Sequence, residues 1–161
     1  MVSFNKSVMK IGSTQFIWLA FLGSLSLLVG AYVFEFLGGL KPCKMCLWQR
    51  WPHLGAVIIG LLVLSSKSVL LMRIACIVVL VGAGIAFFHM GVEFKWWDGP
   101  STCTSGSISN LSSKELMKKI LEAQIIRCDE VAWSFAGLSM AGWNGILSIL
   151  FSFCWLKASF K

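Results

Sequence analysis

The sequence predicts an all-α fold, an integral membrane four-helix bundle with one long loop outside the bilayer. Of the 161 residues, 57% are hydrophobic and only 13% are charged. The mean hydropathy is +0.80, which is typical of a membrane protein and not of an ordinary soluble domain. A membrane-spanning helix needs about 20 mostly apolar residues. Uncharged runs near this length are found at Ile11–Phe34, Trp51–Ser66, Ile74–Val92 and Val131–Leu156.

Four spans within a single domain, residues 1–161, account for these runs. We expect them at about residues 14–35, 46–65, 73–92 and 132–156. The first run exceeds the apolar core of about 7–15 residues found in a signal peptide and lacks a clear small-residue cleavage site, so it is interpreted as a retained span. The second run is long enough only if it begins near Cys43 or Cys46. This start places the cysteine pair at a helix mouth near the lipid headgroups.

Charged residues divide unequally between the two sides that four spans define. The side with both termini has no acidic residue and carries Lys6, Lys10, Lys67, Arg73, Lys157 and Lys161. The opposite side holds all seven acidic residues and the other eight of the 14 basic ones, so the Lys and Arg count alone does not set the orientation. Four cysteines on that opposite side favour an oxidising compartment, where disulfides are stable. We therefore expect a bacterial inner membrane protein with cytoplasmic termini and periplasmic cysteines.

The long loop, at about residues 93–130, begins with many turn-forming residues and then becomes amphipathic. Ser112 and Glu115 have the spacing of a helix capping box. The apolar residues that follow share one helical face and are Leu116, Met117, Ile120, Leu121 and Ile125. We expect a short amphipathic helix here that lies on the bilayer surface. A helix that only covers the mouth of the bundle is the alternative.

Small residues recur in the fourth apolar run. Gly137, Ala141 and Gly145 are spaced every four residues, and small residues at this spacing let a neighbouring helix approach closely in a membrane. The pattern favours a compact bundle and carries no information about activity.

Cys43 and Cys46 form a Cys-x-x-Cys pair, which can close a small ring reversibly. At a helix start, the peptide dipole and free amide groups stabilise the thiolate that carries out disulfide exchange. Arg50 lies four residues after Cys46, on the same face of a continuous helix, and its charge is expected to pair with a Cys46 thiolate. Pro52 cannot donate to the carbonyl of Trp48, so we expect a kink or a break there.

The Cys-x-x-Cys pair is also compatible with a structural disulfide, with half of a zinc site, or with chance in a chain that has six cysteines. Zinc is disfavoured because 24 residues separate Cys103 from Cys128, with no second close pair and no obvious His ligand beside them. These two cysteines are better explained as a loop-closing disulfide. Glycine and hydroxyl residues around Cys103 should leave it reachable by a protein thiol, and Arg127 should favour a Cys128 thiolate.

The remaining cysteines and both histidines have less specific patterns. Cys76 and Cys154 lie within apolar runs without a charged partner, and we interpret them as packing residues. His53 and His89 lie near the face with the cysteine pair, where either could hydrogen-bond a cofactor or carry a proton. For both histidines a structural role is favoured on sequence alone.

Two disulfide pairs on one face need an electron acceptor if the protein oxidises a partner repeatedly. Haem, dinucleotide and iron–sulfur motifs are missing from the sequence. A lipid-soluble quinone requires none of these motifs, since it can diffuse within the bilayer to a groove at the helix mouth. Arg50 would stabilise negative charge that develops on a quinone oxygen.

The motifs together resemble the DsbB family, bacterial inner-membrane disulfide-forming proteins that reduce quinone. The resemblance rests on the loop cysteines and on three segments: CKMCLWQR at residues 43–50, RCDE at 127–130 and WSFAGLSMAGWN at 133–144. It covers the four-span layout from about residue 14 to residue 156. The combination is far more specific than a lone Cys-x-x-Cys.

The resemblance implies a role for each matching residue. A reduced thioredoxin-like oxidase of the DsbA type would attack Cys103 and release Cys128, and the electrons would then move to Cys43 and Cys46. Cys46 would face the quinone with Arg50 as its charge partner, and Cys43 would exchange with the loop cysteines. Some family members have a histidine near the quinone, at a position that His89 roughly matches. The quinone would be ubiquinone in the first place, or menaquinone.

We therefore predict a protein-dithiol:quinone oxidoreductase that reoxidises a DsbA-like periplasmic partner in contact with the membrane lipid and quinone pool. A nucleic acid is not expected, because the formal charge of +7 is accounted for by membrane flanks. A metal is not expected either, because of the cysteine spacing described above. One alternative is a non-catalytic membrane scaffold with a disulfide-stapled loop. The other alternative is a quinone reductase that uses dithiols to make its own product. Such an enzyme would resemble the vitamin K epoxide reductase class, although that family's sequence pattern is not matched.

Overall fold

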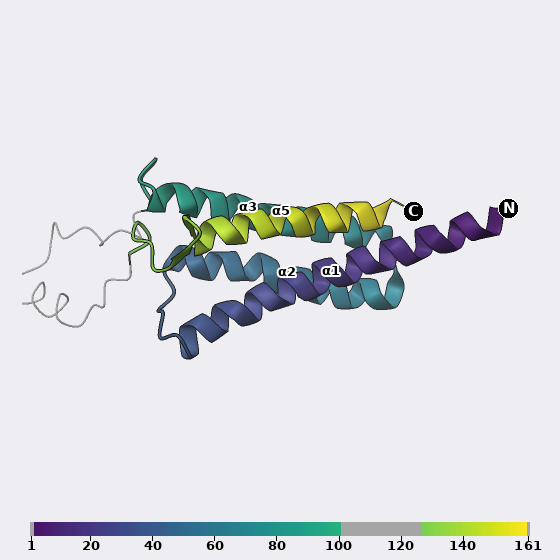
Figure 1. Ribbon diagram of the computed structural model, residues 1–161, viewed down its shortest axis with the longest axis horizontal. Helices are drawn as coiled ribbons and strands as arrows, with labels where there is room; N and C mark the ends of the chain where they lie inside the picture. The colour runs from purple at the N-terminus through teal and green to yellow at the C-terminus, as the bar shows by residue number, and fades with distance from the viewer. Residues whose placement is uncertain (1, 101–126, 161) are drawn as a thin grey trace, which may run out of the picture.

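The computed structural model describes residues 2–100 and 127–160, with side chains from Gly12 onward. Within these residues, the helices are α1 (Val2–Phe36), α2 (Lys44–Ser66), α3 (Val69–Glu93) and α5 (Met140–Ser159). Figure 1 shows them as an elongated four-helix bundle. The predicted amphipathic helix that follows Ser112, and Cys103 as well, lie outside the described residues.

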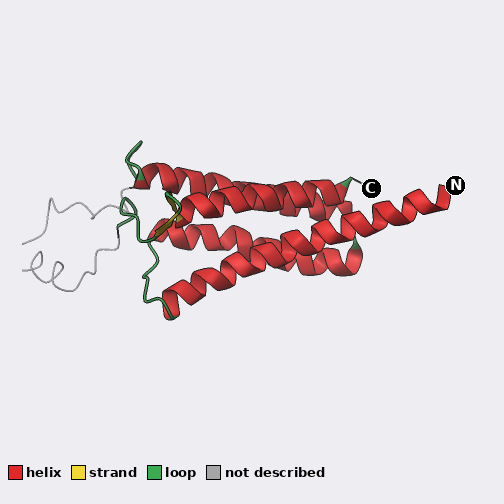
Figure 2. Cartoon of the chain, in the orientation of Figure 1, coloured by secondary structure: helices red, strands yellow, loops and turns green. Residues whose placement is uncertain are grey.

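Each of these helices packs against two neighbours, in the cyclic order α1, α2, α3, α5. The beginning of α1 and the end of α5 lie at the same end of the bundle (Figure 1). Most loops gather at the opposite end, where a small hairpin of β1 (Ser134–Phe135) and β2 (Leu138–Ser139) precedes α5 (Figure 2). Toward this loop end α1 diverges from α5 in Figure 1.

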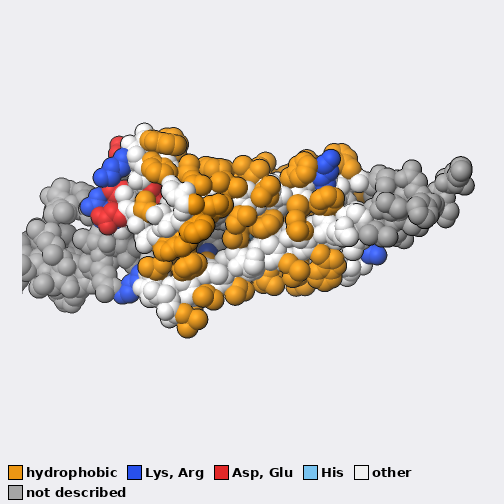
Figure 3. Space-filling view, viewed as in Figure 1, with side chains coloured by type: hydrophobic (Ala, Val, Ile, Leu, Met, Phe, Trp, Pro, Cys, Tyr) orange, Lys and Arg blue, Asp and Glu red, His pale blue; other side chains and the backbone are white. Residues whose placement is uncertain are grey.

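The surface and the helix lengths are those of a multi-pass membrane protein. Three helices in the described ranges are long and apolar enough to cross a membrane: Gly12–Phe36 of α1, then α2 and α3. Large apolar residues such as Leu61, Leu80 and Leu150 are exposed, and Figure 3 shows hydrophobic side chains over the middle of the visible face with charges mostly near its two ends. The predicted all-α membrane bundle is confirmed.

α5 is the shortest of the described helices and brings polar groups into the bundle. Asn144, Ser148 and Ser152 lie on this helix. Ser148 and Ser152 are buried, and the Ser152 hydroxyl donates to the carbonyl of Cys76 over 3.1 Å. Polar side chains inside a membrane bundle face other helices and find partners there, so α5 completes the bundle by packing along α3 and α1.

Pro52 does not interrupt the second helix, so the break that the sequence allowed does not occur. The element runs continuously through Pro52 from Lys44 to Ser66. A Cβ on Gly82 of α3 would lie 2.9 Å from Cβ of Pro52, so the proline ring packs directly against a glycine of the neighbouring helix. Helix packing thus holds the residues around Pro52 in helical conformation despite the missing amide donor.

The fourth helix begins at Met140 and not near residue 132, which corrects the expected start of that span. Ala136 and Gly137 have φ values of 51° and 79° and form the two-residue turn of the hairpin. A turn with positive φ at both positions matches the twist of the paired strands. The hairpin therefore removes Gly137 from the helix, and of the predicted small-residue repeat Ala141 and Gly145 remain in α5.

The main hydrophobic core lies away from the loop end and includes Trp155, Phe151 and Cys154. Cys154 is 5% exposed, as expected for a packing residue. Cys76 is only partly buried, and its Sγ lies 3.2 Å from Oγ of Ser152, so it also takes part in a polar contact between α3 and α5. A second, smaller cluster lies at the loop end and contains the cysteine pair.

Candidate active site

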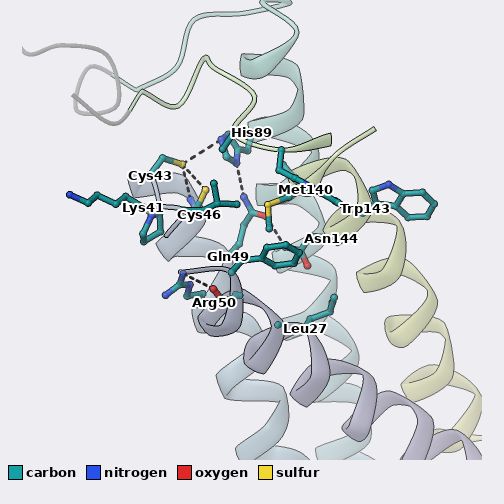
Figure 4. Close-up of a pocket in the computed structure, with 18 of the residues that line it drawn as sticks. Leu27, Lys41, Cys43, Cys46, Gln49, Arg50, His89, Met140, Trp143 and Asn144 are labelled. Atoms are coloured by element: carbon teal, nitrogen blue, oxygen red, sulfur yellow. Dashed lines mark hydrogen bonds between the residues drawn. The ribbon is translucent and has the colours of Figure 1, made fainter. Parts of the chain in front are cut away.

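A cavity of about 270 Å³ opens at the loop end of the bundle, and residues from all four described helices line it (Figure 4). The lining includes every predicted site residue that the structure describes except Cys128: Cys43, Cys46, Arg50 and His89. Apolar residues of α1 and α5, such as Leu27, Ala31 and Met140, form much of the remainder. The sequence-predicted groups from α2 and α3 thus meet in one place.

The cysteine pair lies at the start of α2, as predicted. Cys43 is the N-cap residue, and its Sγ accepts a hydrogen bond from the amide of Cys46 over 3.2 Å. The two Sγ atoms lie 2.8 Å apart as a hydrogen-bonded thiol pair. Cys43 is buried and Cys46 is partly exposed. The hydrogen bond that the Cys43 thiol donates to Cys46, together with burial, raises the pKa of Cys43 to about 12, so Cys43 keeps its proton.

His89 contacts the cysteine pair from α3. Its Nε2 lies 3.5 Å from Sγ of Cys43, and its Nδ1 accepts a hydrogen bond from Nε2 of Gln49 over 2.8 Å. The ring is 2% exposed. Because Nδ1 accepts from Gln49, the neutral ring carries its proton on Nε2, which faces Cys43 Sγ as a donor. A histidine held at both nitrogens in a buried position has a defined ring orientation.

A chain of polar side chains continues from His89 across the interior of the bundle. Nδ2 of Asn144 donates to Oε1 of Gln49 over 2.6 Å, and Nε2 of His53 donates to Oδ1 of Asn144 over 2.8 Å. Ser148 lies within 3.4 Å of both Asn144 and His53. His53 therefore has the structural partners that the sequence favoured. The chain joins α2, α3 and α5 beside the cavity.

Arg50 is engaged by α1 and not by Cys46, which corrects the expected pairing. Its Nη1 donates to Oε2 of Glu35 over 2.5 Å, its Nη2 donates to the carbonyl of Ala31 over 3.4 Å, and the guanidinium lies 4.7 Å from the ring centre of Tyr32. Among the described residues, the buried Nε of Arg50 has no hydrogen-bond partner. Arg50 thus lines the cavity with its buried Nε–H unpaired.

Cys128 packs into the same buried cluster as Cys43, together with Met45 and Val92. The structure therefore brings one loop cysteine to the Cys-x-x-Cys pair. The charge of Arg127 is directed elsewhere than predicted, because its Nε and Nη2 donate to the carboxylate of Asp129 over 2.9 and 2.6 Å. This ion pair lowers the pKa of Asp129.

Glu93, the last residue of α3, is a site residue that sequence reasoning missed. Its side chain is 5% exposed, and Oε1 lies 3.9 Å from Nε2 of His89. Oε2 is buried and has no hydrogen-bond partner within the described ranges. The i,i+4 spacing from His89 at the end of an apolar run was the signal available in the sequence.

Gln49, Asn144 and Glu35 were also not identified as site residues from sequence. Each is a polar or charged residue in or beside an apolar run. Such residues in membrane segments face the bundle interior or one another, and they commonly mark functional sites. Their partners lie on other helices, so the sequence offered a signal for their importance but none for their contacts.

The fold and the site define a class: a helical membrane protein with a Cys-x-x-Cys pair beside an interior cavity, which is the arrangement of a membrane thiol–disulfide oxidoreductase. The model of one protein family, described as disulfide bond formation protein DsbB, matches residues 13–158. The chain belongs to the DsbB family.

Curated relatives agree with this assignment. A "Disulfide bond formation protein B" of Nitrosococcus oceani is 29% identical, with 83% of this chain and 85% of the relative covered. A protein of the same name from Polaromonas sp. (strain JS666) is 30% identical, with 76% of this chain and 76% of the relative covered. Another, from Pasteurella multocida, is 27% identical, with 94% of this chain and 87% of the relative covered. No solved structure matches the chain. The protein therefore has a role in disulfide bond formation, as a disulfide-forming oxidoreductase of the membrane.

Proposed function

We propose that the protein reoxidises the thiols of a periplasmic, DsbA-like dithiol oxidase and transfers the electrons to a membrane quinone, either ubiquinone or menaquinone. The observation that carries this proposal is the position of the Cys43–Cys46 pair. It packs against Cys128 on one side and lines the cavity that also contains Arg50 and His89 on the other. A pair in this position can exchange with loop cysteines and deliver electrons to a ligand in the cavity.

The residues around the cavity fit a quinone headgroup. An apolar ring suits the side chains of Leu27, Ala31 and Met140, and pockets for such ligands are mostly apolar with a few convergent polar groups. The unsatisfied Nε donor of Arg50 and the ring of His89 are such groups. When bound, a quinone would supply the capacity to accept two electrons and two protons.

The chain's own residues divide the remaining tasks. Because Cys43 keeps its proton, the negative charge of a singly deprotonated pair falls on Cys46, the partly exposed cysteine of the cavity. His89 lies between Cys43 and Glu93, and its Nε2–H is placed to stabilise negative charge on the Cys43 sulfur when that thiol loses its proton. Arg50 stabilises negative charge in the cavity, where the low dielectric strengthens its effect.

The external half of the reaction belongs to Cys103 and Cys128. The partner's dithiol would reduce the disulfide between them, and the two resulting thiols would reduce a Cys43–Cys46 disulfide, so that each exchange conserves two electrons. This route requires the loop end of the bundle to face the periplasm and both termini to face the cytoplasm. The contact of Cys128 with the Cys43 cluster supports an exchange between the two pairs.

The test is quinone reduction by the purified protein in detergent, with a reduced DsbA-like oxidase as electron donor. We expect turnover by the wild type and by Cys76→Ser, a thiol control on α3. Both Cys46→Ser and Cys103→Ser should abolish turnover while the proteins remain helical and monodisperse. A folded wild type that reduces no quinone with any donor would contradict the proposal and favour a disulfide-stapled scaffold.

A further inference from the structure

Three potential metal ligands converge in the active site, although they come from separate elements. Sγ of Cys43, Sγ of Cys46 and Nε2 of His89 all lie within 4.8 Å of one another. Figure 4 shows both cysteines and the histidine ring directed toward a common point at the start of α2. Thiolate and imidazole are the ligands that zinc prefers in proteins.

The spacing of these atoms is close to that of a tetrahedral zinc site. With Zn–S bonds of about 2.3 Å and a Zn–N bond of about 2.0 Å, tetrahedral angles place sulfur and nitrogen ligands about 3.5 Å apart and two sulfur ligands about 3.8 Å apart. Cys43 Sγ and His89 Nε2 are already 3.5 Å apart. The Sγ atoms, at 2.8 Å, need to separate by about 1 Å. Loss of the hydrogen bond between them on deprotonation favours this change.

Glu93 would supply the fourth ligand after its carboxylate moves toward the cysteines, because it is not one of the three groups whose ligand atoms lie within 4.8 Å of one another. Its carboxylate is almost fully buried, with Oε1 3.9 Å from His89 Nε2, and its buried Oε2 has no hydrogen-bond partner in the described part of the chain. An unsatisfied carboxylate oxygen in a buried position is costly, and coordination of a cation would satisfy it.

Gln49 can support the histidine as a metal ligand. A histidine that binds a metal through Nε2 carries its proton on Nδ1 and donates it to a neighbouring acceptor. The side-chain amide of Gln49 is adjacent to Nδ1 and can present its oxygen after rotating by half a turn. Asn144 would then reverse its own amide, and His53 would accept at Nε2 with its proton on Nδ1, so that the chain of hydrogen bonds stays intact.

We propose that the reduced protein binds one Zn²⁺ ion through Cys43, Cys46, His89 and Glu93. Binding displaces the two thiol protons and transfers no electrons. A Cys43–Cys46 disulfide provides no thiolate, so the site exists only in the reduced state and closes on oxidation. An occupied site holds both sulfur atoms, so zinc blocks disulfide exchange by the pair until the ion is removed. The site requires only the dithiol and is independent of the electron acceptor.

The first experiment titrates the full-length reduced protein in detergent with Co²⁺ as a spectroscopic substitute for Zn²⁺, under anaerobic conditions and after removal of the reductant. We expect visible bands of tetrahedral cobalt and a thiolate-to-cobalt charge-transfer band, both displaced by one equivalent of Zn²⁺. The oxidised wild type should give neither band. Six-coordinate cobalt without a thiolate band would overturn the proposal.

Variants identify the ligands. Cys43→Ser and Cys46→Ser, which are nearly isosteric and should fold, are expected to lose the charge-transfer band that depends on the pair. His89→Gln and Glu93→Gln should weaken Zn²⁺ binding by about 10-fold or more, the lower limit seen when even outer partners of a metal site are removed. Cys76→Ser controls for thiol content and should bind like the wild type. Equal binding by Cys43→Ser and Cys76→Ser, or unchanged affinity in His89→Gln and Glu93→Gln, would refute the assigned ligands.

A second measurement separates this site from the proposed reaction. Zn²⁺ should protect Cys43 and Cys46 of the reduced protein from alkylation, and a chelator should restore their reactivity. This readout needs neither a partner protein nor a quinone, so it stays informative if the proposed electron transfer fails. Alkylation of both cysteines at the same rate with and without Zn²⁺ would contradict metal binding.

Discussion

Gln49 on α2 donates a hydrogen bond from Nε2 to Nδ1 of His89 on α3 over 2.8 Å. The same amide accepts from Asn144 on α5 through Oε1. One buried side chain therefore joins three helices and orients the histidine beside Cys43. Inside a membrane bundle, such a polar network between helices favours one arrangement of the helices over others.

Replacement of Gln49 by Leu should destabilise the protein by about 1–3 kcal/mol, because His89 and Asn144 each lose a partner in a buried position. Equilibrium unfolding in detergent would measure the effect. Ser65→Ala is the control, since the Ser65 hydroxyl is exposed and donates only to the carbonyl of Leu62. Equal stability of the two variants would show that the network adds nothing to the fold.

Arg50→Lys should lower quinone-dependent turnover by about 10-fold, because lysine retains the charge and loses the fixed geometry of the guanidinium. Lysine also lacks the Nε donor that remains unsatisfied in Arg50. Steady-state quinone reduction would measure this loss, with Arg73→Lys, on an exposed part of α3, as the matched control. Unchanged turnover in Arg50→Lys would remove Arg50 from the proposed site.

Gly82→Ala should destabilise the bundle by about 1–3 kcal/mol, because the added methyl group overpacks the contact between α2 and α3. It would lie 2.9 Å from Cβ of Pro52. Gly84→Ala, one residue beyond Ala83 on the same helix, has nothing within 4 Å of the new methyl group and should change stability by less than about 0.5 kcal/mol. Thermal unfolding in detergent distinguishes these variants, and a smaller loss for Gly82→Ala than for Gly84→Ala would contradict the packing argument.

Alkylation of the reduced protein should modify Cys46 in preference to Cys43 between pH 6 and pH 10. The folded-state pKa of Cys43 is raised to about 12, whereas an ordinary cysteine titrates at about 8.5. Cys43 thus remains protonated throughout this range, and its modification should increase only at more alkaline pH. Mass spectrometry of each peptide, with chelator present, would follow both residues. In unfolded protein the preference for Cys46 should vanish. If Cys43 alkylation in the folded protein rises with a midpoint at about pH 8.5, the hydrogen-bonded thiol pair is contradicted.

Much of the fold follows from local features of the sequence. Long apolar runs predict membrane helices because an unpaired backbone is too costly in lipid, and the four-helix bundle confirms this. The start of α2 at the cysteine pair was also predictable, since only that start makes the span long enough. The hairpin before α5 was missed because its signal, Ala136–Gly137, lies inside an otherwise apolar run.

The sequence by itself determined the class of the protein: its membrane helices, its Cys-x-x-Cys pair and the motifs shared with the DsbB family. Only the tertiary structure decided which groups meet. It paired Arg50 with Glu35 and not with Cys46, directed Arg127 to Asp129, and placed His89 against Cys43. The physical reason is that apolarity and helix starts depend on neighbouring residues, whereas a buried charge or amide takes whichever partner the packing of distant helices brings within hydrogen-bonding distance.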